Sequence, residues 1–422
     1  MARMADTEKN ARIRETYMET KARRLGQRCR VLTVKVQENK LNAVQRDFLK
    51  MAFVEAKWFY NHVLALSERG ADVFSLKYTD IPMVTHYTKD KDEVESKLTH
   101  LSSQMRQEVL TSVLANVRAL AKSKAKGNKV GALKYLSEFN SINLKQHGCT
   151  YQMVGGNHIR IQGLKKPLKV NGLEQLADLG SYELANAKLL QRAGGWYVAL
   201  TVYTDKEPHA TAKPKLGVDL GCQTTLATSD GRKYNVLVEE SKRLKRLQRR
   251  LQRAKKGSNN RWKLRKVLRK CHEHEANKRD DAARKLCHEL SEYRIVMQDE
   301  QVAEWKHRHG KKVQHGILGR VKRLLAERPD TVVLSQWVPT SKQCTACGCK
   351  HEGLTLHDRT FVCPKCGFTE DRDIHAARNM LWFEENIIGV GRTEFTLADF
   401  EARMGALFGG LTQEAAESSA QR

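Results

Sequence analysis

The spacing of apolar residues changes twice along the first half of the chain. Residues 28–36 alternate apolar and polar side chains and include β-branched residues, as a half-buried strand does. From residue 41 to about 66 the apolar residues recur at helical spacing, and a second helical pattern covers about 102–124. We expect one face of the first helix to consist of Phe48, Met51, Ala52, Ala56 and Phe59.

Strand-like segments separated by glycine turns return between residues 149 and 203. The simplest assembly joins them to the early strand. This predicts a β-barrel formed by residues 1–37 and 148–212, with a helical insertion at 38–147.

The second half of the chain begins after a linker at 212–215 with three short apolar strands, which is the order of an RNase H-like β-meander. A helical pattern covers 241–285, a strand follows at 294–300, and a helix is expected near 315–328. We therefore predict an α/β nuclease-type domain, formed by residues 213–341 and 369–400 with a helical hairpin at 241–292. The remaining residues, 401–422, have the small and polar composition of a disordered tail.

Composition adds a class of partner to this outline. The chain has 422 residues, enough for two to four domains, and a formal charge of +27. Such an excess of Lys and Arg is typical of nucleic-acid binding, although a solvated basic surface or an anionic membrane surface would also match it. No signal peptide or membrane-spanning stretch is evident in the sequence, so we expect a cytoplasmic, nucleoid-associated prokaryotic protein without a membrane partner.

The predicted hairpin carries much of this charge. Residues 241–285 contain 19 Lys or Arg against four Asp or Glu. A short coiled coil with a solvated face is one interpretation, and a helix pair lying along a phosphate backbone explains charge of one sign better. The residues predicted to contact nucleic acid are Lys242, Arg243, Arg246, Arg249, Arg250, Arg253, Arg261, Lys263 and Arg265.

Two C-x-x-C pairs predict a metal site. Cys344 and Cys347 are separated from Cys363 and Cys366 by 15 residues, a spacing typical of a four-thiolate zinc ribbon. A redox pair is the competing interpretation. With four protein ligands, one Zn²⁺ ion would be structural, in a ribbon spanning 342–368.

Three segments supply acidic residues that could act together. Asp219 lies on a strand between Gly217 and Gly221, which we expect to leave room for a metal ion and a phosphate. Asp299 and Glu300 close the strand at 294–300, and Asp373 opens a helix after the cysteines. Carboxylates that meet in one pocket repel one another unless cations compensate, which predicts a pair of Mg²⁺ ions.

These motifs, in this order, resemble the transposon-encoded TnpB proteins and the miniature type V CRISPR effectors. The resemblance covers roughly 215–395 and includes the Asp219 motif, the Asp299–Glu300 motif, the cysteine pairs and the segment around Asp373. It implies a RuvC-type nuclease, a wedge-type barrel and a helical recognition insertion. The activity implied is an RNA-guided endonuclease that reads a short motif beside its target and hydrolyses double-stranded DNA by a two-metal mechanism.

The resemblance also implies site residues and partners. Asp219 and Asp373 match the first and last catalytic acids, while Gln298 stands where the commoner pattern has Glu, so Glu300 is the predicted middle acid. A guide RNA, target DNA and a homodimer on one guide are the implied partners. The alternatives are an RNA-guided binder with weak or lost cleavage, a strand-joining transposase, and a zinc-ribbon module without activity.

Overall fold

The computed structural model divides the chain into two compact units, residues 1–206 and 207–422. It describes residues 2–88, 92–206, 213–355, 357–388 and 404–406. Within these ranges, none of the helices has an apolar stretch long enough to cross a bilayer. Each unit has its own hydrophobic core, so each is described by itself below.

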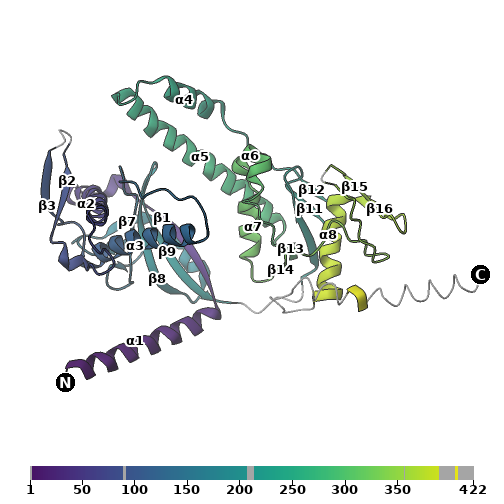
Figure 1. The fold of residues 1–422 in the computed structure, drawn as a ribbon, viewed down its shortest axis with the longest axis horizontal. Helices are drawn as coiled ribbons and strands as arrows, with labels where there is room; N and C mark the ends of the chain where they lie inside the picture. Colours follow the sequence, from purple (N-terminus) through teal and green to yellow (C-terminus); the bar gives the residue numbers. More distant parts are fainter. Residues whose placement is uncertain (1, 89–91, 207–212, 356, 389–403, 407–422) are drawn as a thin grey trace, which may run out of the picture. The chain divides into compact units, whose positions relative to one another are not determined.

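The first unit is built on a seven-stranded antiparallel sheet in the order β4-β8-β9-β1-β7-β6-β5 (Figure 1). The central strand β1 pairs with β9 from Gln27↔Asp205 to Lys35↔Tyr197. The strands are β1 (Gln27–Val36), β4 (Ser141–Leu144), β5 (Tyr151–Met153), β6 (His158–Ile161), β7 (Leu168–Asn171), β8 (Glu183–Arg192) and β9 (Gly195–Asp205).

This sheet differs from the predicted barrel. Its order has β4 and β5 at the two edges, so hydrogen bonds among the described strands do not close a ring. β4 also lies inside the range predicted for the insertion, because Ile142 and Leu144 alternate toward the core beside β8. In addition, residues 2–25 form a helix, α1 (Ala2–Leu25), before the first strand.

The insertion is mainly helical, as expected. α2 (Ala43–Glu68) is capped by Asn42, which forms a capping box with Gln45, and α3 (Ser103–Ala125) is capped by Ser102. On the predicted apolar face Phe48, Ala52, Ala56 and Phe59 are buried, and Met51 is half-buried. The prediction missed a hairpin of β2 (Met83–Tyr87) and β3 (Glu93–Lys97) and the short 3-10 helices at Glu38–Lys40, Tyr78–Asp80 and Leu173–Leu179.

The second unit contains a five-stranded sheet in the order β12-β11-β10-β13-β14. The first three strands form the predicted antiparallel meander, and β13 and β14 are parallel to β10. The strands are β10 (Lys215–Leu220), β11 (Leu226–Thr228), β12 (Lys233–Tyr234), β13 (Arg294–Gln298) and β14 (Val332–Leu334). The third strand, β12, has only two residues.

Helices cover this sheet and extend from it. The helices are α4 (Lys242–Arg253), α5 (Asn259–Glu289), α6 (Lys306–His315), α7 (Leu318–Ala326) and α8 (Arg372–Phe383), followed by a π-helical turn at Glu384–Ile388. One core contains Leu216, Val218 and Leu220 of β10 together with residues of α5 and α7. A second core joins β13 and β14 to α8. The helix predicted at 315–328 is α7 alone, because α6 ends at His315.

The last segments of the chain are described only in part. A two-stranded sheet flanks the second cysteine pair: β15 (Thr360–Val362) precedes Cys363, and β16 (Thr369–Asp371) follows Cys366 and leads into α8. The predicted tail at 401–422 and the end of the predicted nuclease domain lie almost entirely outside the described residues. Of that stretch only 404–406 are described, and Met404 is buried in the core formed by β13, β14 and α8.

Candidate active site and metal centre

The acidic pocket forms where α8 crosses β10. A Cβ at Gly217 would lie 1.9 Å from the carbonyl oxygen of Ala377, so only glycine allows the strand and the helix to approach this closely. Asp219 lies two residues beyond Gly217, and Asp373 lies about one helical turn before Ala377. The crossing therefore brings carboxylates from two distant segments to one pocket.

The prediction that Gly217 leaves room for a ligand is wrong. The space beside Gly217 is filled by the backbone of α8, and a Cβ at Gly221 would lie 2.9 Å from the carbonyl oxygen of Thr224. Gly217 therefore permits close packing of the strand against the helix, whereas Gly221 lines the same cavity as Asp219.

The third acid reaches the pocket from a turn. β13 ends at Gln298, and the Glu300 amide donates a hydrogen bond to the carbonyl oxygen of Gln298. Glu300 thus does not continue the strand, as the predicted strand at 294–300 assumed. Asp219, Glu300 and Asp373 all line one cavity of about 910 Å³.

Asp299 lies in different surroundings from Glu300. Its carboxylate pairs with the Lys322 ammonium at 2.6 Å, and about half of its side chain is exposed. Lys322 also donates to the carbonyl oxygen of Glu300, which ties this turn to α7. Asp299 does not line the pocket that contains the other two carboxylates.

The electrostatics of the pocket show the expected repulsion. Burial, together with the carboxylates of Asp373 and Glu300, holds the pKa of Asp219 well above its usual range. Burial also raises the pKa of Glu300, against the opposing effect of Lys322. A bound cation would stabilise the ionised carboxylates and so lower the free-energy cost of ionising them.

Polar neighbours hold Asp373. The Thr224 hydroxyl donates to its Oδ2 at 3.0 Å, and the Lys233 ammonium lies 3.6 Å from the same oxygen. Lys233 also pairs with Asp371 at 2.7 Å, and Asp371 caps α8 by accepting from the amides of Asp373 and Ile374. Asp371 is therefore a helix cap, and the carboxylate next to the other acids belongs to Asp373.

The three carboxylates do not meet at a single point. Among the residues that the structure describes, the four cysteines are the one group of three or more candidate ligands whose atoms all lie within 4.8 Å of one another. The acids are more widely spaced. Their oxygens suit hard divalent ions, and two ions about 3.5–4 Å apart can be shared by more widely spaced carboxylates than one ion can.

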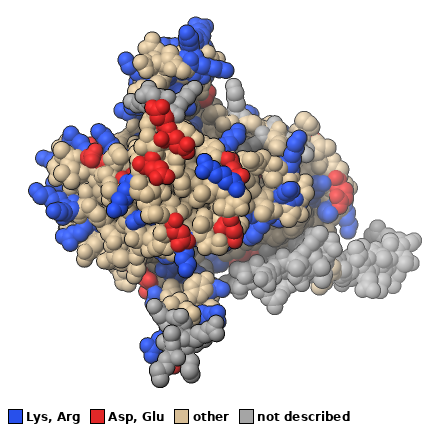
Figure 2. All heavy atoms as spheres, turned by 60° about the vertical axis from the view of Figure 1, so that its left-hand side comes forward, with Lys and Arg blue, Asp and Glu red and all other residues tan. Residues whose placement is uncertain are grey.

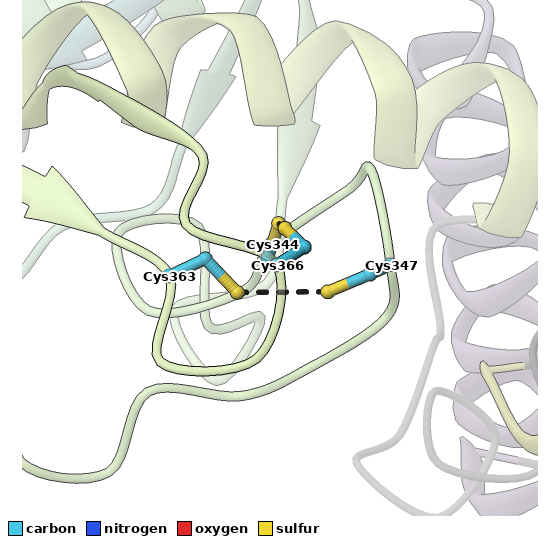
Figure 3. A group of neighbouring side chains, drawn as sticks. All are labelled: Cys344, Cys347, Cys363 and Cys366. Carbon is cyan, nitrogen blue, oxygen red and sulfur yellow. Dashed lines mark hydrogen bonds between the residues drawn. The ribbon is translucent and has the colours of Figure 1, made fainter.

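The four predicted cysteine ligands form a compact cluster (Figure 3). The Sγ atoms of Cys344 and Cys366 lie 3.7 Å apart, and those of Cys347 and Cys363 lie 3.5 Å apart. A disulfide would need about 2.05 Å, whereas four thiolates at about 2.3 Å from a tetrahedral zinc ion are about 3.8 Å apart. The spacing therefore suits a shared metal ion.

Two glycine knuckles shape this cluster. Gly348 and Gly367 adopt φ angles of 69° and 71°, and their amides donate to the carbonyl oxygens of Cys344 and Cys363. Although burial opposes it, the backbone amides of Cys366 and Lys365 lower the pKa of Cys363 to about 6. The knuckle amides thus favour the thiolate form of this side chain, which is the form that binds a metal ion.

A polar pair on α8 connects the cysteine cluster to the acidic pocket. The buried His375 ring bonds through Nε2 to the carbonyl oxygen of Gln343 and stacks on Phe361. Asn379 donates to the carbonyl oxygens of Thr340 and Gln343. This role was not predicted from the sequence, although two polar residues four apart among buried alanines are a signal for it.

The basic hairpin is present and exposes most of the predicted residues. α4 and α5 pack through Leu244, Leu247, Leu264, Leu268 and Cys271. Arg261 is the exception, because its guanidinium donates to the carbonyl oxygens of Leu251 and Ala254 at the end of α4. The exposed members of the predicted set are Lys242, Arg243, Arg246, Arg249, Arg250, Arg253, Lys263 and Arg265.

Basic residues are not confined to the hairpin. On the face shown in Figure 2, Lys and Arg side chains are spread over the surface, with Asp and Glu side chains among them. Charges of both signs are thus mixed on this face, whereas α4 contains no acidic residue.

Two family models match the second half of the chain. Residues 198–303 match the OrfB_IS605 family, described as "probable transposase", and residues 326–380 match the TNB domain of Cas12f1-like proteins. The first match includes Asp219 and Glu300, and the second includes the four cysteines and Asp373.

Two curated proteins resemble this chain. A Streptomyces pristinaespiralis protein, provisionally named RNA-guided DNA endonuclease, is 30% identical over 203 residues, which are 45% of this chain and 50% of that protein. InsQ of Escherichia coli, with the same provisional name, is 28% identical over 235 residues, 49% of this chain and 58% of InsQ. The alignments thus span half the length of the first relative and 58% of the second.

A solved structure, of a Cas12f1–sgRNA–target DNA complex, aligns with 81% of this chain and 83% of its own. Its TM-score is 0.44 and its sequence identity 13%, so it does not establish a shared arrangement of domains.

Proposed function

We propose that this chain is an RNA-guided DNA endonuclease of the group formed by the TnpB proteins and miniature type V effectors, which its motifs resemble. The observation that carries the proposal is the meeting of Asp219, Glu300 and Asp373 in one pocket. The names of both curated relatives support the same activity. The proposed partners are a guide RNA and the double-stranded DNA that it matches, with a pair of copies on one guide as the predicted assembly.

In this proposal the three carboxylates hold two Mg²⁺ ions. Such ions activate water and stabilise the leaving oxygen of a phosphodiester. The chain supplies the geometry: Gly217 sets the crossing of β10 and α8, and the Thr224 hydroxyl orients Asp373. The raised pKa of Asp219 means that ionising this site is costly without cations, which fits a site made to bind them.

We assign Glu300, not Asp299, as the middle acid. Glu300 lines the pocket and contributes to the raised pKa of Asp219, whereas Asp299 pairs with Lys322. We further propose that Zn²⁺ occupies the four-cysteine cluster as a structural ion. The cluster leaves no open position for catalysis because all four ligands come from the protein.

The test is guided cleavage by the purified protein. With its co-purified RNA and Mg²⁺, it should cut DNA that matches the guide beside a short recognition motif. Asp219→Ala and Asp373→Ala should each reduce cutting by more than a thousandfold and leave binding of the RNA and the DNA within about twofold. Normal cutting by both variants would reject the site.

A strand-joining transposase is the second candidate, favoured by the description of the first matching family. Incubation with transposon-end DNA and Mg²⁺ separates the two activities. Joined products that require Asp219 would support the transposase, and guided cleavage without joining would support the endonuclease. An RNA-guided binder with lost cleavage would bind matched DNA and cut neither substrate.

A further inference from the structure

An exposed tryptophan lies at the acidic pocket. Trp337 follows β14, and its side chain lines the same cavity as the three carboxylates while about two thirds of its surface is exposed. Trp305, which also lines the cavity, packs instead against the core formed with α5 and α7. A large apolar ring left in water beside a cavity bordered by charged groups is a feature of ligand-binding surfaces.

The loop that carries Trp337 is held in place on both sides of this residue. Val338 is buried in the core formed by β13, β14 and α8. The buried Gln298 side-chain amide donates to the carbonyl oxygens of Ser335 at 2.9 Å and Val338 at 2.7 Å. Its oxygen accepts from the Thr340 hydroxyl at 3.0 Å. Trp337 is thus presented by an ordered loop, which reduces the entropy lost on binding.

The groups around the cavity indicate what would stack on this ring. Lys342, Arg359 and Arg372 line the cavity together with the acids, so cationic and anionic groups both border it. Phosphate can bind to the cationic side chains and to metal ions held by the acids, while an aromatic ring offers a stacking surface for any base. Neighbouring sites for a phosphate and a base are complementary to a single nucleic-acid strand.

We propose that Trp337 stacks on one base of the DNA strand that enters the acidic pocket, and that Gln298 is the positioning residue that holds Trp337 there. This inference rests on the proposed function, because it takes the strand to be cut as the ligand. It also explains why an amide stands at position 298. A glutamate there could not donate to the two carbonyl oxygens, whereas glutamine donates to both.

Stacking can be measured without cutting. A short single-stranded DNA oligonucleotide, with 2-aminopurine placed at each position in turn, is added to the full-length protein in Ca²⁺ instead of Mg²⁺. The wild-type protein should quench the fluorescence at one or two adjacent positions. Trp337→Ala should abolish this quenching and weaken binding about 5- to 100-fold, and Trp337→Phe should retain most of both.

Leu237→Ala is the matched control, because Leu237 is about as exposed as Trp337 and does not line the cavity. It should leave quenching and affinity unchanged. An oligonucleotide with an abasic nucleotide at the quenched position should bind the wild type more weakly. The same change should cause little further loss of affinity for Trp337→Ala. Unchanged quenching in Trp337→Ala, or a wild type that does not bind the oligonucleotide, would overturn the proposal.

Failure of the proposed function gives a different result. A protein that shows Trp337-dependent quenching but never cuts guided DNA retains the stacking site and loses the endonuclease assignment. Conversely, guided cutting with unchanged quenching and affinity in Trp337→Ala overturns the stacking site alone.

Gln298→Glu tests the positioning role. We expect Gln298→Glu to reduce quenching and binding nearly as much as Trp337→Ala does. The double variant should lose little more quenching or affinity than Trp337→Ala alone. If position 298 were instead a lost catalytic acid, Gln298→Glu would increase cutting and leave quenching intact. Thr340→Val, which removes only the hydroxyl bonded to Gln298, should cause a smaller loss of quenching and keeps the test decisive if Gln298→Glu unfolds.

Discussion

At the scale of single residues, the proposed chemistry depends on which carboxylates share surroundings. Asp219 and Glu300 are both buried enough to have raised pKa values, and Asp373 is oriented by Thr224. Asp299 is adjacent in sequence to Glu300 but is neutralised by Lys322 at the surface. A difference of one residue therefore separates a pocket carboxylate from a surface ion pair.

The choice between these neighbours can be tested by two matched substitutions. Glu300→Gln keeps the size of the side chain and removes its charge, so we expect guided cutting to fall by at least a hundredfold. Asp299→Asn loses only a partly exposed ion pair, worth about 0–1 kcal/mol, and should cut within about threefold of the wild type. Single-turnover cleavage rates measure both, and an active Glu300→Gln protein would reject Glu300 as the middle acid.

At the scale of secondary-structure elements, α8 organises the second unit. It contacts β10 at Gly217, supplies Asp373, and binds the cysteine-bearing segment through His375 and Asn379. Two sites that are separate in chemistry thus share one helix. Displacing this helix should affect both.

The helix crossing leads to a prediction at Gly217. In Gly217→Ala the new methyl group would meet the Ala377 carbonyl oxygen, so α8 must move away from β10. Overpacking of this kind typically costs about 1–3 kcal/mol, and we expect a lower unfolding midpoint in urea as well as slower cutting. Gly319→Ala on α7 is the control for substitution of a glycine, because no atom lies within 4 Å of its Cβ position and its φ angle is not positive.

A second prediction concerns the cysteine cluster. The wild type should contain one zinc ion per chain, and Cys347→Ser should lower the zinc content at least tenfold at a fixed free zinc concentration. Cys349→Ser is a close control, because Cys349 is not part of the cluster. It should retain the ion.

Loss of zinc should also disturb the acidic pocket. His375 and Asn379 bind the backbone of Gln343 next to Cys344, so unfolding of this segment should loosen α8 and slow cutting. Limited proteolysis of 342–368 and cleavage rates should change together. A zinc-free protein with full activity would contradict this coupling.

At the scale of the whole molecule, net charge is the property that most narrows the class of partner. The chain carries a formal +27, and the hairpin of α4 and α5 is a concentrated source of it. Except for Arg261, the predicted residues expose their side chains and remain available to phosphates. Binding through such residues depends on salt.

This leads to a prediction about salt dependence. Replacing Arg243, Arg246 and Arg250 together by Gln should reduce the slope of log affinity against log salt concentration by about 0.7–0.9 for each phosphate that the protein no longer neutralises. Binding of the co-purified RNA and of matched duplex DNA should each be measured between roughly 50 and 200 mM salt. The control is Arg323→Gln on α7, an exposed arginine outside the hairpin. An unchanged slope in the triple variant would mean that the hairpin is a solvated coiled coil.

Local pattern was enough to predict many of the elements. The apolar pattern predicted the strand that carries Asp219, in which Leu216, Val218 and Leu220 are buried, and helical spacing predicted the hairpin. The C-x-x-C spacing predicted a cluster of four cysteines, because each knuckle is a local turn that aims two thiols the same way. These features depend on residues close together in sequence.

Contacts between distant segments could not be predicted in this way. The sequence left the middle acid ambiguous. The side chains of Asp299 and Glu300 are presented differently if the strand continues to residue 300 than if a turn follows Gln298. The role of Gly217 was misinterpreted, because α8 lies more than 150 residues further along the chain. Residue types and local spacing thus define the candidate groups. Which of them share a pocket is set by long-range packing, whose geometry no short window of sequence contains.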